Sequence, residues 1–333
     1  MRHNKQHLTL SKAPSWGATF KSIITLSALF MAITLLNACS ANALRDRSDE
    51  SGESLSVSLH NLADKAPGMV GIALVTDTDT ITVNNGVRYP MMSVFKLHEA
   101  LAVADRLASL SQSLDSTISV RATELDRNTW SPMLKKYDGD DFEISVGELA
   151  RYAVTSSDNN ASNLLFNHIV SPEETDRFIR SIAPDTTFRI RHAESAMKER
   201  HSLSYDNHTS PLAAALLIRK VFTDTVVAPA MQDSIKTWLS TVTTGADRLG
   251  APVMNHPDVF FAHKTGSGYR NPQGELIAHN DVGFFRLPDG SCYALAVLIR
   301  DFNSSEDAAS ALIAEISRLV YTSLSTQSSG IFR

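Results

Sequence analysis

Cysteine is scarce in this sequence. Only Cys39 and Cys292 occur among its 333 residues, which excludes a framework of several disulfides. Cys39 follows an apolar run near the N-terminus, whereas Cys292 opens the run Cys-Tyr-Ala-Leu-Ala-Val-Leu-Ile, which is typical of a buried strand. We therefore interpret Cys292 as a small, inert hydrophobic residue.

The sequence also lacks the spacings of metal ligands. Its eleven histidines include no His-Glu-x-x-His and no similar arrangement. This absence disfavours a metallohydrolase, and we expect no metal or other cofactor. The composition is otherwise that of an ordinary globular protein, with 43% hydrophobic and 20% charged residues.

Acidic residues are missing from the first 38 positions, which carry four Lys or Arg residues and then an apolar run at 23–36. The run is about 15 residues long, shorter than the ~20 that a membrane-spanning helix needs. A basic segment followed by a short apolar run is typical of a secretory signal peptide. Without this segment, 27 Lys and Arg stand against 36 Asp and Glu, a net charge of −9. We therefore expect no nucleic-acid partner.

Two processing routes remain open after this apolar run. Leu36-Asn37-Ala38-Cys39 resembles the lipobox of bacterial lipoproteins, in which cleavage precedes a cysteine that carries lipid. Cleavage after Ala43 would instead leave a soluble protein that begins at Leu44. We favour the lipoprotein, because a cysteine directly after the apolar run has little structural reason to be there. We thus expect a periplasmic protein that touches the membrane only through a lipid on Cys39.

Hydrophobic periodicity predicts strands near both ends of the chain and helices between them. This order predicts an α/β fold whose sheet combines both chain ends, with an inserted helical lobe and a site in the cleft between the lobes. The expected helices cover residues 55–66, 93–110, 146–155, 160–169, 173–182, 211–222, 230–242 and 304–326, and the expected strands cover 70–76, 80–83, 259–263, 275–287 and 293–299.

Four short polar elements follow one another at characteristic distances. Ser93-x-x-Lys96 comes first; Ser157-Asp158-Asn159 begins 64 residues after Ser93, Glu194 lies 101 residues after it, and Lys264-Thr265-Gly266 begins 171 residues after it. A Ser-x-x-Lys motif alone has little value, because Ser195 and Lys198 form a second copy without a later Ser-Asp-Asn. The order and spacing of the four elements resemble those of class A serine β-lactamases.

The resemblance runs from about residue 55 to 322. It implies hydrolysis of β-lactam antibiotics, penicillins and cephalosporins among them, by a monomer with an antiparallel sheet flanked by helices. Tyr205 to Pro211 and Ala278 to Asp281 resemble the extended-spectrum cephalosporinase subgroup. The expected organisation is a signal peptide at 1–38, a flexible tether at 39–53, one catalytic unit at 54–325 and a polar tail at 326–333. The α/β lobe of that unit takes 54–89 and 243–325, and the helical lobe takes 90–242.

Ser93 and Lys96 carry the central chemistry that we expect. A lysine three residues after a serine lies on the same helical face, so its amine reaches the hydroxyl as an activating base must. In isolation, a capping serine and a solvated lysine explain the motif equally well. The resemblance makes Ser93 the nucleophile and Glu194 the group that activates the deacylating water. Whether Lys96 or Glu194 is the base in acylation stays open.

The remaining motifs have roles that the resemblance implies. Ser157 relays a proton to the leaving nitrogen, and Asn159 binds the substrate amide and steadies Lys96. The segment Lys264 to Ser267 runs beside the substrate, and the backbone N–H groups of Ser93 and Ser267 form the oxyanion hole. The other expected substrate contacts are Arg248 for a carboxylate and Trp130 as a wall of the cleft.

Two positions depart from the family pattern. Lys198 stands where most members have an asparagine that helps to hold the deacylating water, and Asn207 replaces the acid of the usual Arg–Asp clamp. We therefore expect a less restrained omega loop and a cleft widened for bulky cephalosporins.

Two other functions remain open: a D,D-peptidase or transpeptidase of the same superfamily, and a non-catalytic envelope lipoprotein. Glu194 discriminates against the peptidase, because a peptidase lacks an efficient deacylating glutamate.

Overall fold

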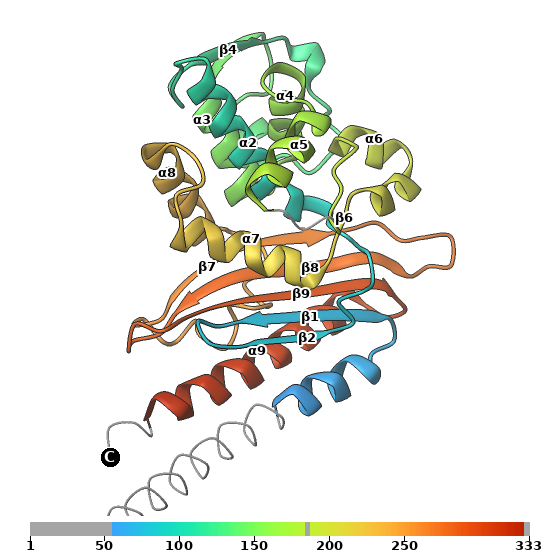
Figure 1. Cartoon of the computed structure of the whole chain (residues 1–333). Coiled ribbons are helices and arrows are strands. Elements are labelled where there is room, and N and C mark those ends of the chain that lie inside the picture. Colours follow the sequence, from blue (N-terminus) through green and yellow to red (C-terminus); the bar gives the residue numbers. More distant parts are fainter. Residues whose placement is uncertain (1–54, 184–186, 330–333) are drawn as a thin grey trace, which may run out of the picture. The chain divides into compact units, whose positions relative to one another are not determined.

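A five-stranded antiparallel sheet forms the base of the protein. The computed structural model describes residues 55–183 and 187–329; the expected signal peptide, the tether and Cys39 lie outside these residues. The strand order β2-β1-β9-β8-β7 places both chain ends in one sheet, as predicted (Figure 1). The strands are β1 Met69–Val75, β2 Thr80–Val83, β7 Phe260–Ser267, β8 Leu276–Arg286 and β9 Cys292–Phe302.

Helices cover both faces of this sheet. The helix at residues 55–64 and α9, Glu306–Ser329, lie on one face, and α7, Pro211–Thr223, crosses the other (Figure 1). A separate hydrophobic cluster fills each side of the sheet, because the central strands β8 and β9 are buried on both faces. The helical lobe above α7 contains α2 Phe95–Ser109, α3 Val146–Thr155, α4 Asn159–His168, α5 Pro172–Ile182, α6 Glu194–Glu199 and α8 Pro229–Ser240.

Short elements connect these layers. Two small antiparallel pairs join distant segments: β3 Tyr89–Pro90 with β6 His208–Thr209, and β4 Thr117–Val120 with β5 Phe142–Ser145. Periodicity does not predict pairs this short. Single 3-10 turns occur as η1 Met92–Val94, η2 Ala122–Glu124, η3 Pro132–Lys135 and η4 His201–Asp206.

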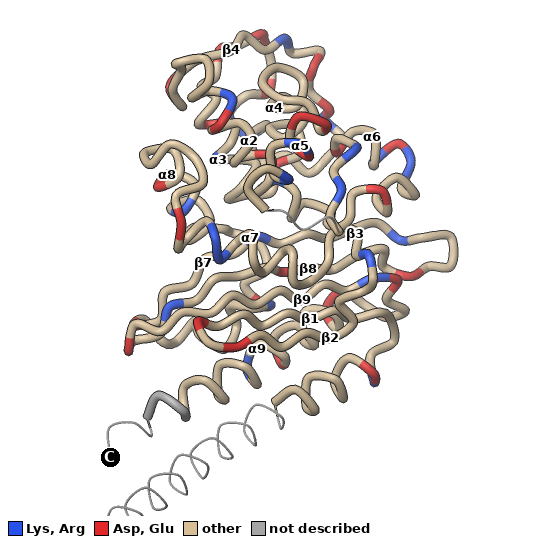
Figure 2. Tube along the Cα trace, in the orientation of Figure 1, with Lys and Arg blue, Asp and Glu red and all other residues tan. Residues whose placement is uncertain are grey.

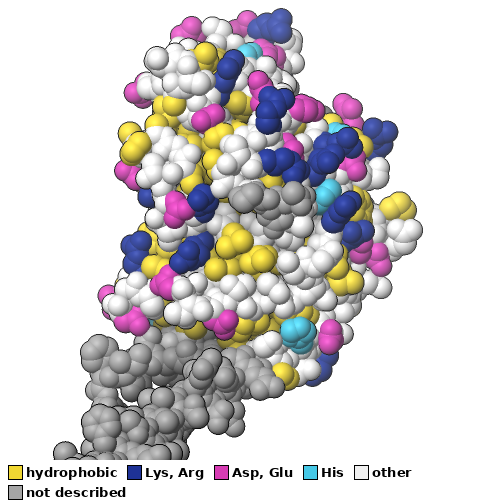
Figure 3. Space-filling view, viewed as in Figure 1, with side chains coloured by type: hydrophobic (Ala, Val, Ile, Leu, Met, Phe, Trp, Pro, Cys, Tyr) yellow, Lys and Arg dark blue, Asp and Glu magenta, His cyan; other side chains and the backbone are white. Residues whose placement is uncertain are grey.

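Basic and acidic residues are interspersed along the chain in both lobes (Figure 2). Apolar side chains gather on one face at the level of α7 (Figure 3), where Leu216 is exposed. Among the described residues, no helix combines the length and apolar character that crossing a membrane requires.

Several element boundaries differ from the sequence prediction by one to four residues, and α6, Glu194–Glu199, was not predicted as a helix. Ser93 lies in η1, which runs directly into α2 at Phe95; the left-handed φ of 45° at Met92 prevents the helix from extending further toward the N-terminus. β7 extends beyond the predicted end at residue 263 to Ser267, since the whole Lys-Thr-Gly-Ser segment pairs with β8. α9 continues to Ser329, into the segment expected as a polar tail.

Asn280 on β8 ties the sheet to the turn that carries Ser93. Its fully buried side chain donates to the carbonyl oxygens of Pro90 at 2.7 Å and Met91 at 3.2 Å, and accepts from Ile299 N–H at 3.0 Å. Gly266 on β7 brings the sheet equally close, because an added Cβ would overlap the Met91 carbonyl oxygen. The position of Ser93 is therefore set from beneath by the sheet.

Replacing Asn280 by alanine should lower the free energy of unfolding by about 2–4 kcal/mol, because it leaves buried backbone groups without partners. Urea denaturation followed by circular dichroism measures this change. Asn167→Ala, at an exposed position on α4, is the matched control, with an expected change below about 0.5 kcal/mol. Equal losses in the two variants would contradict the role of Asn280.

Candidate active site

The Ser93 hydroxyl lies between a buried cation and a buried anion. Lys96 Nζ donates to Ser93 Oγ at 3.0 Å, and Ser93 Oγ donates to Glu194 Oε1 at 2.9 Å. Lys96 Nζ is also 3.0 Å from Glu194 Oε1, and their side chains are 0% and 5% exposed. Two groups that can accept the Ser93 proton thus touch the same oxygen, which is the arrangement that an activated serine requires.

Lys96 is held by oxygens from the loop between α3 and α4. Its Nζ donates to the Ser157 carbonyl oxygen at 2.9 Å and to Asn159 Oδ1 at 2.7 Å. Ser157 has a left-handed φ of 56°, a conformation uncommon for residues other than glycine. The adjacent Asp158 caps α4 and accepts from Ala161 N–H at 2.9 Å. These contacts stabilise the loop conformation that presents two oxygens to Lys96.

Lys264 on β7 approaches the same loop from the sheet. Its fully buried Nζ donates to Ser157 Oγ at 3.0 Å and to the Thr265 carbonyl oxygen at 2.9 Å. Burial, reinforced by the nearby Lys96 charge, lowers the pKa of Lys264 well below its usual range. The Ser157 hydroxyl is therefore connected to an amine that gives up a proton easily.

Glu194 begins α6, and two side-chain amides fix its position. Asn163 Oδ1 accepts from Ser195 N–H at 3.1 Å, which joins α6 to α4. Asn207, fully buried, accepts from Arg191 N–H at 2.8 Å and His192 N–H at 3.0 Å, and donates to the His192 carbonyl oxygen at 2.8 Å. The expectation of a less restrained loop is therefore wrong at this position, because the amide of Asn207 replaces an ion pair with three hydrogen bonds.

Lys198 lines the cleft and forms an ion pair with Asp126. Both side chains are about one-third exposed, at 31% and 35%. The pair joins α6 to the loop before Trp130, so Lys198 serves as a link between two walls of the cleft. Sequence reasoning missed Asp126, which lies 72 positions away from Lys198 in the chain.

A second cation lies at the opposite end of β7. Arg248 is 8% exposed; its Nη2 donates to Ser267 Oγ at 2.7 Å and its Nη1 to the Asn280 carbonyl oxygen at 2.9 Å. The hydroxyls of Thr244 and Thr265 are 2.6 Å apart beside it. Hydroxyls next to a guanidinium suit a carboxylate ligand. Thr244 was not predicted, although it directly precedes the Gly-x-x-Arg segment.

Ser93 and Glu194 open onto one cavity of about 530 Å³, whereas Lys96 and Lys264 are buried behind its wall. Trp130 forms an exposed part of its wall, and its Nε1 donates to the Ser156 carbonyl oxygen at 2.8 Å. Tyr269 lines another part, and its ring stacks on His201 with the centroids 3.8 Å apart; the sequence carried no signal for this contact. Of the predicted residues, those with side chains in the cavity wall are Ser93, Trp130, Ser157, Asn159, Glu194, Arg248, Thr265 and Ser267.

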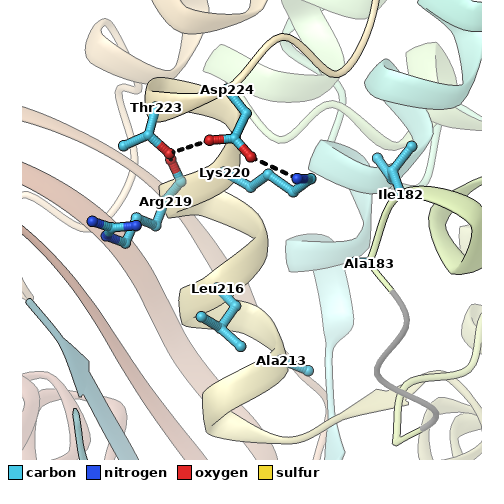
Figure 4. Close-up of a pocket in the computed structure, with 8 residues that line it drawn as sticks. All are labelled: Ile182, Ala183, Ala213, Leu216, Arg219, Lys220, Thr223 and Asp224. Carbon is cyan, nitrogen blue, oxygen red and sulfur yellow. Dashed lines mark hydrogen bonds and ion pairs between the residues drawn. The ribbon is translucent and has the colours of Figure 1, made fainter. Parts of the chain in front are cut away.

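A second cavity, of about 300 Å³, lies between the end of α5 and α7 (Figure 4). Ile182 and Leu216 make part of its wall apolar, and Lys220 and Asp224 add charge. Lys220 Nζ donates to Asp224 Oδ2 at 2.6 Å, so these two charges neutralise each other. None of the four polar motifs contributes to this cavity.

Nowhere in residues 55–183 and 187–329 do three His, Cys, Asp or Glu side chains group as metal ligands.

The sequence of this chain is similar to those of known proteins. Residues 54–324 match the model of the β-lactamase enzyme family. A β-lactamase from Phocaeicola vulgatus is 43% identical over 271 residues, which are 81% of this chain and 84% of that protein. The extended-spectrum β-lactamase PER-1 from Pseudomonas aeruginosa is 32% identical over 255 residues, 76% of this chain and 81% of PER-1.

Solved structures agree with the sequence relatives. A class A β-lactamase from Bacteroides cellulosilyticus superposes with a TM-score of 0.77 at 29% identity, over 83% of this chain and 99% of that one. The extended-spectrum β-lactamase TLA-3 superposes with a TM-score of 0.78 at 31% identity, over 82% of this chain and 98% of the TLA-3 chain. With a family match over most of its length and class A enzymes as its structural neighbours, the chain belongs to the β-lactamase enzyme family and is a class A β-lactamase.

Proposed function

We propose that Ser93 carries the acyl group during β-lactam hydrolysis, the reaction that gives resistance to these antibiotics. One observation carries the proposal: Ser93 Oγ contacts Lys96 Nζ at 3.0 Å and Glu194 Oε1 at 2.9 Å. In acylation, Oγ bonds to the β-lactam carbonyl carbon and the ring C–N bond breaks. The Ser93 proton passes to the Glu194 carboxylate, or to Lys96 once its ammonium has given a proton to Glu194, since all three groups lie within hydrogen-bond distance of one another.

The leaving nitrogen must receive a proton, and Ser157 is suited to deliver it. Its hydroxyl accepts from Lys264 Nζ, whose pKa burial lowers. Deacylation then requires a base for water, a role for which Glu194 is suited because it is buried and touches Ser93 Oγ. Water bonds to the acyl carbon, the bond to Oγ breaks, Glu194 takes a proton from water, and Ser93 regains one.

Substrate binding rests on the two edges of the cavity. We assign the carboxylate of the substrate to Arg248, Thr265 and Ser267, and its side-chain amide to Asn159. The backbone N–H groups of Ser93 and Ser267 serve as the oxyanion hole, and Gly266 allows the substrate to approach the backbone of β7. Trp130 provides an apolar contact at the mouth. The relatives named as extended-spectrum enzymes support cephalosporins as substrates beside penicillins.

Ser93→Ala should abolish turnover, whereas Glu194→Gln should acylate but accumulate the covalent intermediate, because different residues act in the two steps. Intact-mass spectra after mixing with a penicillin and a chromogenic cephalosporin measure this. Ser195→Ala, in the second Ser-x-x-Lys motif, is the matched control and should turn over normally. Full multiple turnover by Glu194→Gln would remove Glu194 from the mechanism, and stoichiometric acylation of the wild type would favour the D,D-peptidase.

Arg248→Ala should raise the barrier for kcat/KM by about 2–3 kcal/mol, the range for a charge-assisted hydrogen bond to a carboxylate. Steady-state kinetics with several penicillins and cephalosporins measure the effect. The control Arg177→Ala removes an exposed arginine of α5 and should leave the constants unchanged. Unchanged constants for Arg248→Ala across the same substrates would mean that another group binds the carboxylate.

We infer further that the mature enzyme is a periplasmic lipoprotein whose lipid is attached to Cys39. The support is the sequence alone: a basic segment, a short apolar run and Leu-Asn-Ala-Cys at its end. Cys39→Ser should move activity from the membrane fraction to the soluble periplasmic fraction, as cell fractionation measures. Wild-type enzyme that is already soluble, with Leu44 as its first residue, would show processing by the ordinary signal peptidase.

A further inference from the structure

Glu99 is a buried carboxyl group with no role in the reaction described above. It lies on α2, one turn after Lys96, and is 0% exposed. Neither of its oxygens has a well-formed hydrogen bond among the described residues, and the same holds for the neighbouring Ser162 hydroxyl, which is also 0% exposed. An unpaired buried carboxylate is costly, so this group favours its neutral form.

Glu99 and Ser162 form a layer directly beneath the reactive groups. On α2, Glu99 follows Lys96 by three residues; on α4, Ser162 follows Asn159 by three residues. Lys96 and Asn159 are joined above them at 2.7 Å. The charged groups that act on Glu99 are Lys96 from its own helix and Glu194 from α6. The layer beneath the site therefore holds a second carboxyl group that can attract the same ammonium.

The adjacent His98 faces a different part of the protein. Its ring lies 5.9 Å from the ring of Phe188, and Asp176 on α5 is the charged group that acts on it. His98 is thus a buried polar neighbour of Glu99 that is separate from the reactive pair, and it provides a matched control.

Burial favours the neutral form of Glu99 over its carboxylate. Burial raises the pKa of Glu99 well above its ordinary value, and the Glu194 charge acts in the same direction. Ser162 and Lys96 oppose this rise but do not cancel it. Two carboxylates that share one ammonium in a dry site cannot both be fully stabilised.

We propose that Glu99 is a positioning residue: as a neutral acid it leaves the Lys96 ammonium with Ser93 and Glu194, and as a carboxylate at alkaline pH it draws that ammonium away. Loss of the neutral form would separate Lys96 from Ser93 Oγ and leave Glu194 without its counter-ion. Ionisation of Glu99 therefore contributes to the loss of turnover at alkaline pH.

The test is the pH profile of kcat/KM for a chromogenic cephalosporin, from about pH 5 to about pH 10. Glu99→Gln keeps the shape of the side chain but cannot ionise. The pH at which its kcat/KM falls on the alkaline side should be about one unit or more higher than in the wild type. Its kcat/KM on the plateau should lie within about threefold of the wild-type plateau. His98→Asn should retain the wild-type profile.

Thermal melting gives a second readout whose sign follows from the raised pKa of Glu99. Such a group stabilises the fold fully below its unfolded pKa, and this contribution is lost as the pH rises through the folded pKa. Glu99→Gln lacks that loss. Its melting temperature should therefore exceed that of the wild type by an amount that grows between acidic and alkaline pH, whereas the difference for His98→Asn should not grow in this way.

Superimposable pH profiles for the wild type and Glu99→Gln would overturn the proposal, whatever the melting temperatures show. A parallel loss of activity at every pH would overturn it too, because the neutral isostere should support the reaction. If Glu99→Gln does not fold, Ser162→Ala decides the question. Removing the Ser162 hydroxyl disfavours the carboxylate form of Glu99, so the alkaline fall in kcat/KM should move to higher pH. A fall at the same pH as in the wild type would contradict the proposal.

Discussion

The buried contact between Lys96 and Glu194 is the interaction on which the site depends. A single ammonium, fully buried, must be neutralised by a carboxylate 3.0 Å away, and both touch the Ser93 hydroxyl. Removing either partner would leave an uncompensated charge in a dry environment, a large cost. The fold must therefore bring α2 close to α6, because Lys96 and Glu194 are 98 positions apart in the chain.

Much of the surrounding structure serves to hold these two groups. From the sheet side, Asn280 binds the carbonyl oxygens before Ser93, and Gly266 allows β7 to approach them. From the loop side, Asn207 fixes the backbone before Glu194 with three hydrogen bonds. Buried amides are effective here because each one donates and accepts at once. The reactive serine is thus positioned by polar groups that have no chemical role themselves.

The same low dielectric that strengthens the pair also makes it sensitive to neighbouring charge. Burial and the Lys96 charge lower the pKa of Lys264, and burial raises the pKa of Glu99, because a dry environment disfavours the charged form of each group. Two lysines and two glutamates carry no net charge when all four are ionised, and they also carry none when one lysine and one glutamate are both neutral. The distribution of protons among the four groups is therefore a property of the whole cluster.

The sequence by itself predicted the order of the elements and most of the residues that meet in the candidate site. Periodicity located the five strands of the sheet to within a few residues, and the spacing of the motifs singled out Ser93, Lys96, Ser157, Glu194 and Lys264, because such patterns are local or depend only on order. The tertiary structure decided what local patterns cannot contain: the 3-10 turn at Ser93, the extension of β7, the clamp by Asn207 and the pair of Lys198 with Asp126. Each of these depends on partners far away in the chain, which only the folded backbone brings within hydrogen-bond distance.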